Sequence, residues 1–150
     1  MGRGRLMLLD TNVLSECMRP RPAMQVLAWL DAHHPHSLYT SAVSRAEIEL
    51  GLALMTAGQR QAGLAQAAQA MFEVDFAGRC LPFNDQAASH YASLVAARTR
   101  MGRPISVEDA QIAAIALAHG MTLATRNTAD FERIEGLEVV NPWGEQQFSF

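Results

Sequence analysis

Lysine is absent from this chain of 150 residues, and its 12 basic side chains other than histidine are all arginines. The absence of lysine excludes mechanisms that depend on one, including P-loop nucleotide hydrolysis and Schiff-base chemistry. It also weighs against a phospho-receiver domain, an acidic α/β fold that normally carries a lysine beside its carboxylates. Phosphate recognition stays open, because the arginine guanidinium suits bidentate contacts to phosphate oxygens.

The chain also has few cysteines, no long apolar run and no excess of positive charge. The two cysteines, Cys17 and Cys80, indicate neither a disulfide framework nor a zinc site, so we expect free thiols in a reducing cytoplasm. No apolar stretch approaches the ~20 residues that span a bilayer, and residues 6–9 are too few for a secretory signal. The net charge of −3 argues against a protein that coats nucleic acid through bulk electrostatics.

The chain has the length and the 49% hydrophobic content of one globular domain, residues 1–150, with a core at about 6–143 and a tail at 144–150. Patterns typical of strands alternate with patterns typical of helices. Strands are expected at 6–9, 37–40, 80–83, 121–125 and 137–140, and helices at 13–18, 23–33, 44–55, 59–74, 85–101 and 107–119. This alternation predicts an α/β fold with a mainly parallel sheet.

The apolar run of residues 6–9 ends abruptly in Asp10, Thr11 and Asn12. Such a run is typical of a strand buried on both faces of a parallel sheet, and ligands bind outside the carboxyl ends of such strands. Asp10 is therefore expected at the lip of a cleft, where a carboxylate needs partners or a metal. The alternative is that Asp10 or Asn12 only caps the next helix, because both residue types are favoured N-caps.

Two more carboxylates stand near predicted helix starts. Glu47 lies three residues after Ser44, and Asp109 lies three residues after Ser106, which is the spacing of a capping box. Each acid therefore has a purely structural interpretation, as a capping residue or as a charge that complements the helix dipole. Glu108 is the alternative to Asp109 in its pair, and its position in the predicted helix makes Asp109 the preferred candidate.

Considered together, Asp10, Glu47 and Asp109 have a second interpretation. In a parallel sheet, the end of the first strand, the helix start after the second strand and the end of the strand at 121–125 lie at one edge. Carboxylates that meet there without a lysine would repel one another unless a divalent cation lay between them. Hard oxygen ligands suit Mg²⁺ or Mn²⁺, and such a cation can activate water for phosphodiester hydrolysis.

Five segments carry a family resemblance: LLDTNVLSE, SAVSRAEIELG, ISVEDAQIAAIALAHG, LATRNTADF and VVNPW. In this order and spacing, from about Leu6 to Trp143, they resemble the PIN-domain ribonuclease toxins of the VapC family, FitB-like members in particular. The resemblance implies a three-layer α/β/α PIN domain with a roughly five-stranded central sheet. It also implies a metal-dependent endoribonuclease that hydrolyses RNA phosphodiester bonds, the toxin of a type II toxin–antitoxin pair.

The resemblance assigns roles to individual positions. By position, Asp10, Glu47 and Asp109 match the catalytic acids that bind the family's Mg²⁺ or Mn²⁺ cofactor, and Asn12 matches a polar residue that positions them. Thr11 and Thr125 are expected to support these acids.

The family's fourth acid falls on Asn127, whose amide can hold a ligating water or ligate directly but adds no negative charge. Asp130, about one helical turn away, is a candidate substitute. We expect one metal held well, and a second held weakly or only with substrate. Beside the cleft, Arg126 is a candidate phosphate contact. Arg19 and Arg21 could also contact phosphate, but an ordinary solvated arginine is the preferred interpretation for both.

The resemblance also implies the partners of the protein. These are RNA as substrate, a cognate DNA-binding antitoxin whose tail covers the acidic cleft, and a second copy in a homodimer or a larger assembly on DNA. The implied location is the cytoplasm, with no membrane contact. An alternative function, favoured by Asn127, is a catalytically weakened PIN-like module that binds RNA or antitoxin without cleavage. A DNA nuclease is a weaker third option, because such enzymes usually carry more acids and longer helical inserts.

Overall fold

The computed structural model describes residues 5–144, and its centre is a parallel sheet. The strands are β1 (Met7–Leu9), β2 (Leu38–Ser41), β3 (Cys80–Leu81), β4 (Thr122–Ala124) and β5 (Val139–Val140). They are ordered β3-β2-β1-β4-β5, and every pairing between neighbours is parallel. The predicted mainly parallel sheet of roughly five strands is confirmed, although all strands except β2 are shorter than their sequence patterns.

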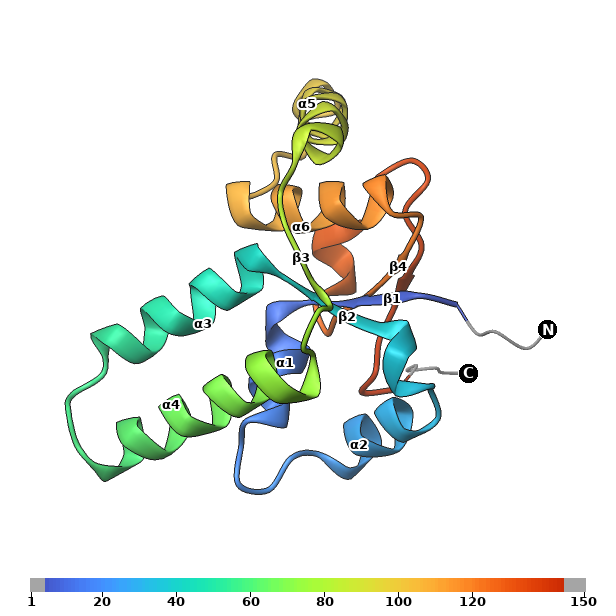
Figure 1. Cartoon of the computed structure of the whole chain (residues 1–150). Coiled ribbons are helices and arrows are strands. Elements are labelled where there is room, and N and C mark those ends of the chain that lie inside the picture. Colours follow the sequence, from blue (N-terminus) through green and yellow to red (C-terminus); the bar gives the residue numbers. More distant parts are fainter. Residues whose placement is uncertain (1–4, 145–150) are drawn as a thin grey trace.

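Helices cover both faces of this sheet (Figure 1). They are α1 (Thr11–Cys17), α2 (Met24–Asp31), α3 (Ala42–Leu54), α4 (Gln59–Ala70), α5 (Asp85–Arg100) and α6 (Val107–Ala118). One face is covered by α5 and α6, and the other by α1, α2 and α4, with α3 extending from the end of β2 and contacting α1 and α4. The expected three-layer α/β/α architecture is therefore present.

Two hydrophobic cores lie on the two sides of the sheet, because successive side chains of a strand point to opposite faces. Leu8 packs in the core under α5 and α6, whereas Met7 and Leu9 pack in the core with α1 to α4. Both faces of β1 are buried, which explains its uninterrupted apolar run. Helix α6 packs closely on the sheet, since residues 112–116 are completely buried and three of them are alanines.

The start of α3 differs from the sequence prediction. This helix begins at Ala42, and its N-cap is Ser41, whose Oγ accepts the N–H of Ser44 at 3.1 Å. The predicted capping box between Ser44 and Glu47 is therefore wrong. The cause is that β2 runs on to Ser41, whose extended backbone leads directly into the helix and whose hydroxyl takes the capping role. Glu47 lies one turn further along and has no capping function.

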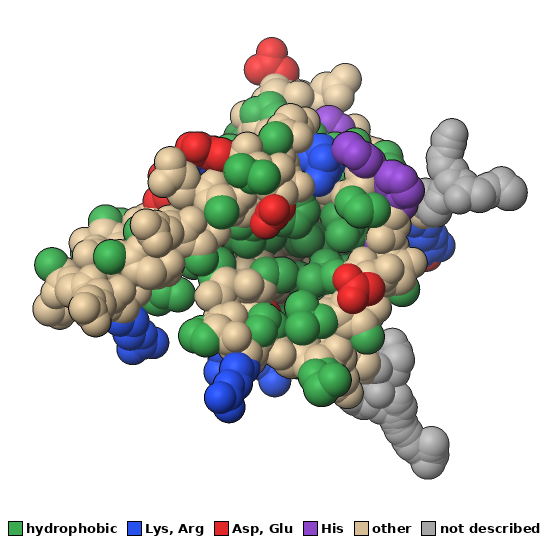
Figure 2. Space-filling model, turned by 60° about the horizontal axis from the view of Figure 1, so that its bottom comes forward, with side chains coloured by type: hydrophobic (Ala, Val, Ile, Leu, Met, Phe, Trp, Pro, Cys, Tyr) green, Lys and Arg blue, Asp and Glu red, His purple; other side chains and the backbone are tan. Residues whose placement is uncertain are grey.

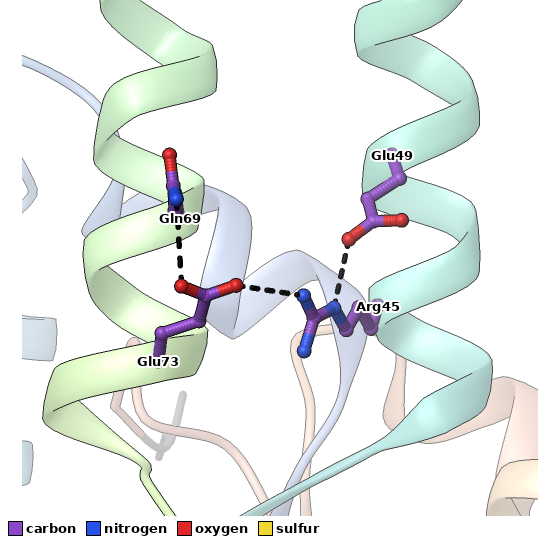
Figure 3. Close-up of polar contacts among 4 residues, drawn as sticks. All are labelled: Arg45, Glu49, Gln69 and Glu73. Carbon is purple, nitrogen blue, oxygen red and sulfur yellow. Dashed lines mark hydrogen bonds and ion pairs between the residues drawn. The ribbon is translucent and has the colours of Figure 1, made fainter.

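The α3–α4 hairpin projects from the body of the molecule (Figure 1), and an arginine joins its two arms near the base (Figure 3). Arg45 of α3 donates to Glu49 at 2.7 Å and to Glu73 at 3.4 Å, and its guanidinium lies 5.2 Å from the ring centroid of Phe72. Glu73 belongs to a π-helical turn, η2 (Met71–Asp75), which continues α4 where an ordinary helix was expected. These contacts, among partly exposed side chains, connect α3 to the end of α4.

Three histidines lie at the turn between α2 and β2, around the short helix η1 (Pro35–Ser37). His34 and His36 are exposed, and the Nδ1 of His33 lies 2.7 Å from the carbonyl oxygen of Trp29. Figure 2 shows histidine side chains on the molecular surface.

Two further sequence expectations concern cysteine pairing and the chain end. Cys17 and Cys80 are free thiols, as expected. Within residues 5–144, no helix is long and apolar enough to cross a bilayer. The predicted tail, residues 144–150, lies outside the described residues except for Gly144.

Candidate active site

Asp10 follows β1 directly and is 4% exposed. It is the N-cap of α1, and its Oδ1 accepts the N–H of Thr11 at 2.8 Å. Its Oδ2 accepts the hydroxyl of Thr125, just after β4, at 2.7 Å. Burial raises the pKa of Asp10, and the hydrogen bonds from Thr125 and Thr11 oppose that rise. Asp10 is thus a helix cap and also a carboxylate at the carboxyl edge of the sheet.

The completely buried hydroxyl of Thr125 is the centre of a small polar network. It accepts from Nδ2 of Asn12 at 3.1 Å and from the backbone N–H of Asn127 at 3.0 Å while it donates to Asp10. The Oδ1 of Asn12 in turn accepts the N–H of Arg126 at 3.1 Å. The amide of Asn12 therefore joins the ends of β1 and β4, a geometry that suits the positioning role expected of this residue.

Glu47 reaches the same edge from α3. Its Oε1 lies 2.5 Å from Oγ1 of Thr11, which also lies 2.8 Å from Oγ of Ser44. The sequence pattern presented Ser44 as a cap, and its contact with Thr11 was not expected. Because Glu47 does not cap its own helix, its approach to Thr11 supports the functional interpretation of this acid over the structural one.

Asp109 lies in the first turn of α6, where its N–H donates to Oγ of the N-cap Ser106 at 3.2 Å, as predicted. Burial and the charge of Asp10 raise the pKa of Asp109 to about 6. The charges of Asp130 and Glu47 add smaller increases, and Ser106 opposes them. Asp109 therefore shares one electrostatic environment with the other acids, whereas the neighbouring Glu108 is exposed.

Position 127 contributes no charge to the site. Asn127 is exposed, and its backbone rather than its side chain bonds to Thr125. Asp130, in the short helix η3 (Thr128–Phe131), is also exposed, yet its charge raises the pKa of both Asp10 and Asp109. A fourth negative charge therefore acts on the site from Asp130.

The acids of the site present only oxygen atoms as possible metal ligands, which is the chemistry of a site for a hard cation. In the arrangement described for residues 5–144, no three or more Asp, Glu, His or Cys side chains are grouped so that they could hold a metal. Asp10 and Glu47 instead contact the hydroxyls of Thr125 and Thr11. The repulsion that raises the pKa of Asp109 is nevertheless what a divalent cation would relieve, so the residues fit such a cation in chemistry.

A cavity of about 1120 Å³ opens between α1, α3 and α4, and Glu47 is the member of the acid set that lines it. Asn12 lines the cavity as well, and apolar side chains such as Leu52 line much of the remainder. Arg126 stands at the cavity with its guanidinium 4.8 Å from the ring centroid of Trp143. The face carrying α2 and α4 is hollowed, and hydrophobic side chains gather in the hollow (Figure 2).

Two further charged residues, Arg19 and Glu16, lie at this cavity, and Glu16 was not predicted from the sequence as a site residue. Arg19 lines the cavity, and its Nη1 lies 3.3 Å from Oε1 of Glu16, a side chain only 7% exposed. The other oxygen of Glu16 accepts the N–H of Ala23 at 2.7 Å. Arg21 is exposed, as expected. No sequence signal marks Glu16, since an acid near the end of a short helix is most often solvated.

Comparisons with known proteins identify the family of the chain. The PIN domain family model matches residues 7–137. The chain is 43% identical to VapC ribonuclease Y4jK of Sinorhizobium fredii, over 92% of this chain and 98% of that protein. It is 40% identical to toxin FitB of Neisseria gonorrhoeae, over 92% of this chain and 99% of FitB. A chain in the structure of FitAB bound to an IR36 DNA fragment is 39% identical, with a TM-score of 0.86 over 96% of this chain and 100% of that one. The chain therefore belongs to the PIN-domain family.

Proposed function

We propose that this protein is an endoribonuclease that hydrolyses RNA phosphodiester bonds, and that it is the toxin of a toxin–antitoxin pair. The observation that carries the proposal is the electrostatic interaction of three acids in a PIN domain: besides burial, the charges of Asp10, directly after β1, and of Glu47, on α3, both raise the pKa of Asp109. Relatives that the chain matches over nearly their whole length bear the names VapC ribonuclease and toxin FitB, which supports both parts of the proposal.

Asp10, Glu47 and Asp109 would hold a Mg²⁺ or Mn²⁺ ion. When bound, such a cation lowers the pKa of a coordinated water and neutralises charge on a phosphoryl oxygen. The mutual repulsion of the acids favours its binding, and Asp130 adds a further negative charge. We propose one firmly held ion, because Asn127 supplies an amide where a fourth acid would strengthen a second site.

The chain's own residues would orient the acids and the substrate. Thr125 and Asn12 fix Asp10 before substrate arrives, so its carboxylate does not need to be reoriented during the reaction. The planar guanidinium of Arg126, held over Trp143 at the cavity, would contact a phosphate of the RNA strand.

The cavity next to the acids is the proposed docking place of the antitoxin tail. Its apolar lining suits a peptide, and an arginine of that tail lying among the carboxylates would inhibit the enzyme by charge pairing. FitAB, a complex bound to DNA, contains a chain of the same fold, which supports a DNA-binding partner for this chain. We place the protein in the cytoplasm, where its RNA substrate and its free thiols belong, and propose that it forms a homodimer.

The test is RNA cleavage by the purified protein with Mn²⁺, in the presence and absence of EDTA. Asp10→Asn and Asp109→Asn should reduce cleavage to background, because each removes one negative charge from the acid set while keeping its shape. Asp31→Asn, a change of an exposed acid on α2, is the matched control and should leave cleavage unchanged. Cleavage that persists in both site variants would refute the site assignment.

A non-catalytic PIN module that binds RNA or antitoxin is the second candidate function, favoured by the uncharged Asn127. Calorimetric titration with Mn²⁺ separates the two candidates. The enzyme requires stoichiometric binding that Asp109→Asn weakens, whereas the module requires no stoichiometric binding.

A further inference from the structure

Arg98, on α5, is a buried cation outside the acid set. It is 4% exposed, which is rare for arginine because a buried charge must be fully hydrogen-bonded. Its Nε donates to the carbonyl oxygen of Arg103 at 2.7 Å, and its Nη1 donates to the carbonyl oxygens of Asp130 and Glu132, each at 3.1 Å. All of these acceptors are backbone carbonyls, and in the described chain Arg98 forms no ion pair with a carboxylate.

The three carbonyls belong to two loops, one that leads into α6 and one at η3. Arg103 is in the loop between α5 and α6, three residues before Ser106, which caps the helix that carries Asp109. Asp130 and Glu132 are at η3, in the segment that follows Thr125. A single buried side chain therefore connects the loop leading to one acid with the loop that contains another.

A second connection between the same loops lies at the surface. Arg103 Nη2 is 3.5 Å from Oε1 of Glu132, and these side chains are 39% and 58% exposed. An exposed pair of this kind contributes little, typically less than about 1 kcal/mol. Hydrogen bonds from a buried cation are stronger, and loss of one partner leaves the others unsatisfied. The buried connection through Arg98 is thus the one expected to fix the spacing of the loops.

We propose that Arg98 is a positioning residue of the acidic site, which holds the backbone of Asp130 and the approach to Asp109 at a fixed separation. This inference rests on the proposed function in so far as the acids serve to bind a cation. Arg98 contributes no atom to that cation or to RNA. Its effect is transmitted through backbone carbonyls, so the identity of the side chains in the two loops does not matter for it.

The experiment compares Arg98→Gln with Arg98→Lys and with two controls. Arg103→Gln removes the surface connection between the same loops, and Leu94→Ala destabilises the core at another buried position of α5. Hydrogen exchange of the metal-free protein is measured separately for each peptide along the chain. Mn²⁺ binding is measured by calorimetry at a temperature where all variants are folded.

Arg98→Gln is expected to accelerate exchange in residues 102–108 and 127–134 selectively, and to weaken Mn²⁺ binding by roughly 10-fold, the lower end of the range for residues that hydrogen-bond metal ligands directly, because Arg98 acts only through the backbone. Arg98→Lys, which retains a donor cation, should recover part of both losses. Arg103→Gln should change neither, and Leu94→Ala should lower stability without selective exchange at the two loops.

Two results would overturn the inference: unchanged exchange of both loops in Arg98→Gln, or the same general increase that Leu94→Ala shows. If the wild type binds no Mn²⁺ but the loops still exchange selectively, the positioning role stands and the proposed catalytic function fails. The exchange measurement therefore distinguishes the two failures.

Discussion

The hydroxyl of Thr125 donates to Oδ2 of Asp10 at 2.7 Å, and both residues are buried at the carboxyl edge of the sheet. The bond links the ends of β1 and β4, which lie 115 residues apart in the chain. It is the shortest of the three hydrogen bonds that involve the Thr125 hydroxyl. The candidate site is therefore assembled by the same contacts that close the sheet edge.

Replacement of Thr125 by valine should destabilise the fold by about 1–3 kcal/mol, the usual cost of leaving buried polar groups without a partner. The groups that lose this partner are Oδ2 of Asp10, Nδ2 of Asn12 and the N–H of Asn127, and within residues 5–144 only the long 3.4 Å contact between the first two then remains to them. Urea unfolding at pH 7 measures the change, with Thr99→Val on the exposed side of α5 as control. Equal midpoints for Thr125→Val and wild type would contradict the expectation.

Stability should fall as the pH rises from about 4 to above 6. The pKa of Asp109 is about 6 in the folded chain, above its ordinary value of 3.8, so the folded state holds its proton more tightly than the unfolded state does. The stabilisation is complete below pH 3.8 and is lost as the pH passes 6. Asp109→Asn should therefore be more stable than wild type at pH 7.5, by about 1–2 kcal/mol after solvent screening, and the difference should vanish near pH 4.

Denaturant unfolding of wild type and Asp109→Asn across pH 4–8, in metal-free buffer with EDTA, checks this dependence. Glu108→Gln, next in the chain and exposed, is the control and should follow the wild-type curve. A constant difference between wild type and Asp109→Asn at every pH would show that the carboxyl does not titrate as expected.

Substitutions at positions 127 and 130 that change the charge should shift the affinity for Mn²⁺ in opposite directions. Asn127→Asp adds an acid where the family has one and should tighten Mn²⁺ binding roughly tenfold, whereas Asp130→Asn removes a charge and should weaken it by a similar factor. Calorimetric titration measures both, with Glu135→Gln, an exposed acid, as control. Unchanged affinity in Asn127→Asp would place position 127 outside the metal's surroundings.

Arg126→Ala should weaken RNA binding without altering metal binding. If this guanidinium contacts one phosphate of single-stranded RNA, the slope of log K against log salt should become shallower by about 0.7. Fluorescence anisotropy with a labelled RNA in EDTA gives the slope, and Arg100→Ala, an exposed arginine at the end of α5, is the control. A parallel line displaced to weaker binding would instead indicate a packing role through Trp143.

Much of the fold could be predicted from the sequence because its patterns are locally determined. The apolar run of β1 and the Ser106 cap of α6 form as predicted, because each depends on residues close in the chain. The Ser44 capping box failed because Ser41, three residues earlier, offers an equally good hydroxyl and β2 extends to it. Such competition between adjacent caps is decided by where the strand ends, which is a tertiary effect.

Some supports of the acids, namely Asn12, Thr11 and Thr125, were predicted from the sequence, and others were not. Asp10 and Asp109 follow from their places at element ends, whereas the burial of Arg98 and Glu16 depends on contacts that sequence spacing does not reveal. Glu47 was named for its part in an acid set, and its hydrogen bond to Thr11 joins residues 36 positions apart. The π-helical turn at Met71–Asp75 likewise has no local signature that distinguishes it from an ordinary helix end.

Asp10 is both the N-cap of α1 and a carboxylate of the candidate site. This combination determines which substitution can remove its charge without disturbing the helix. Asparagine is as good an N-cap as aspartate, whereas alanine costs roughly 1 kcal/mol at such a position. Asp10→Asn therefore removes the charge and keeps the helix, which yields a folded protein that presents an intact cavity. On the proposed function, such a variant would no longer cleave RNA, yet it would keep the apolar cavity for the inhibitory partner and would compete with active copies for that partner.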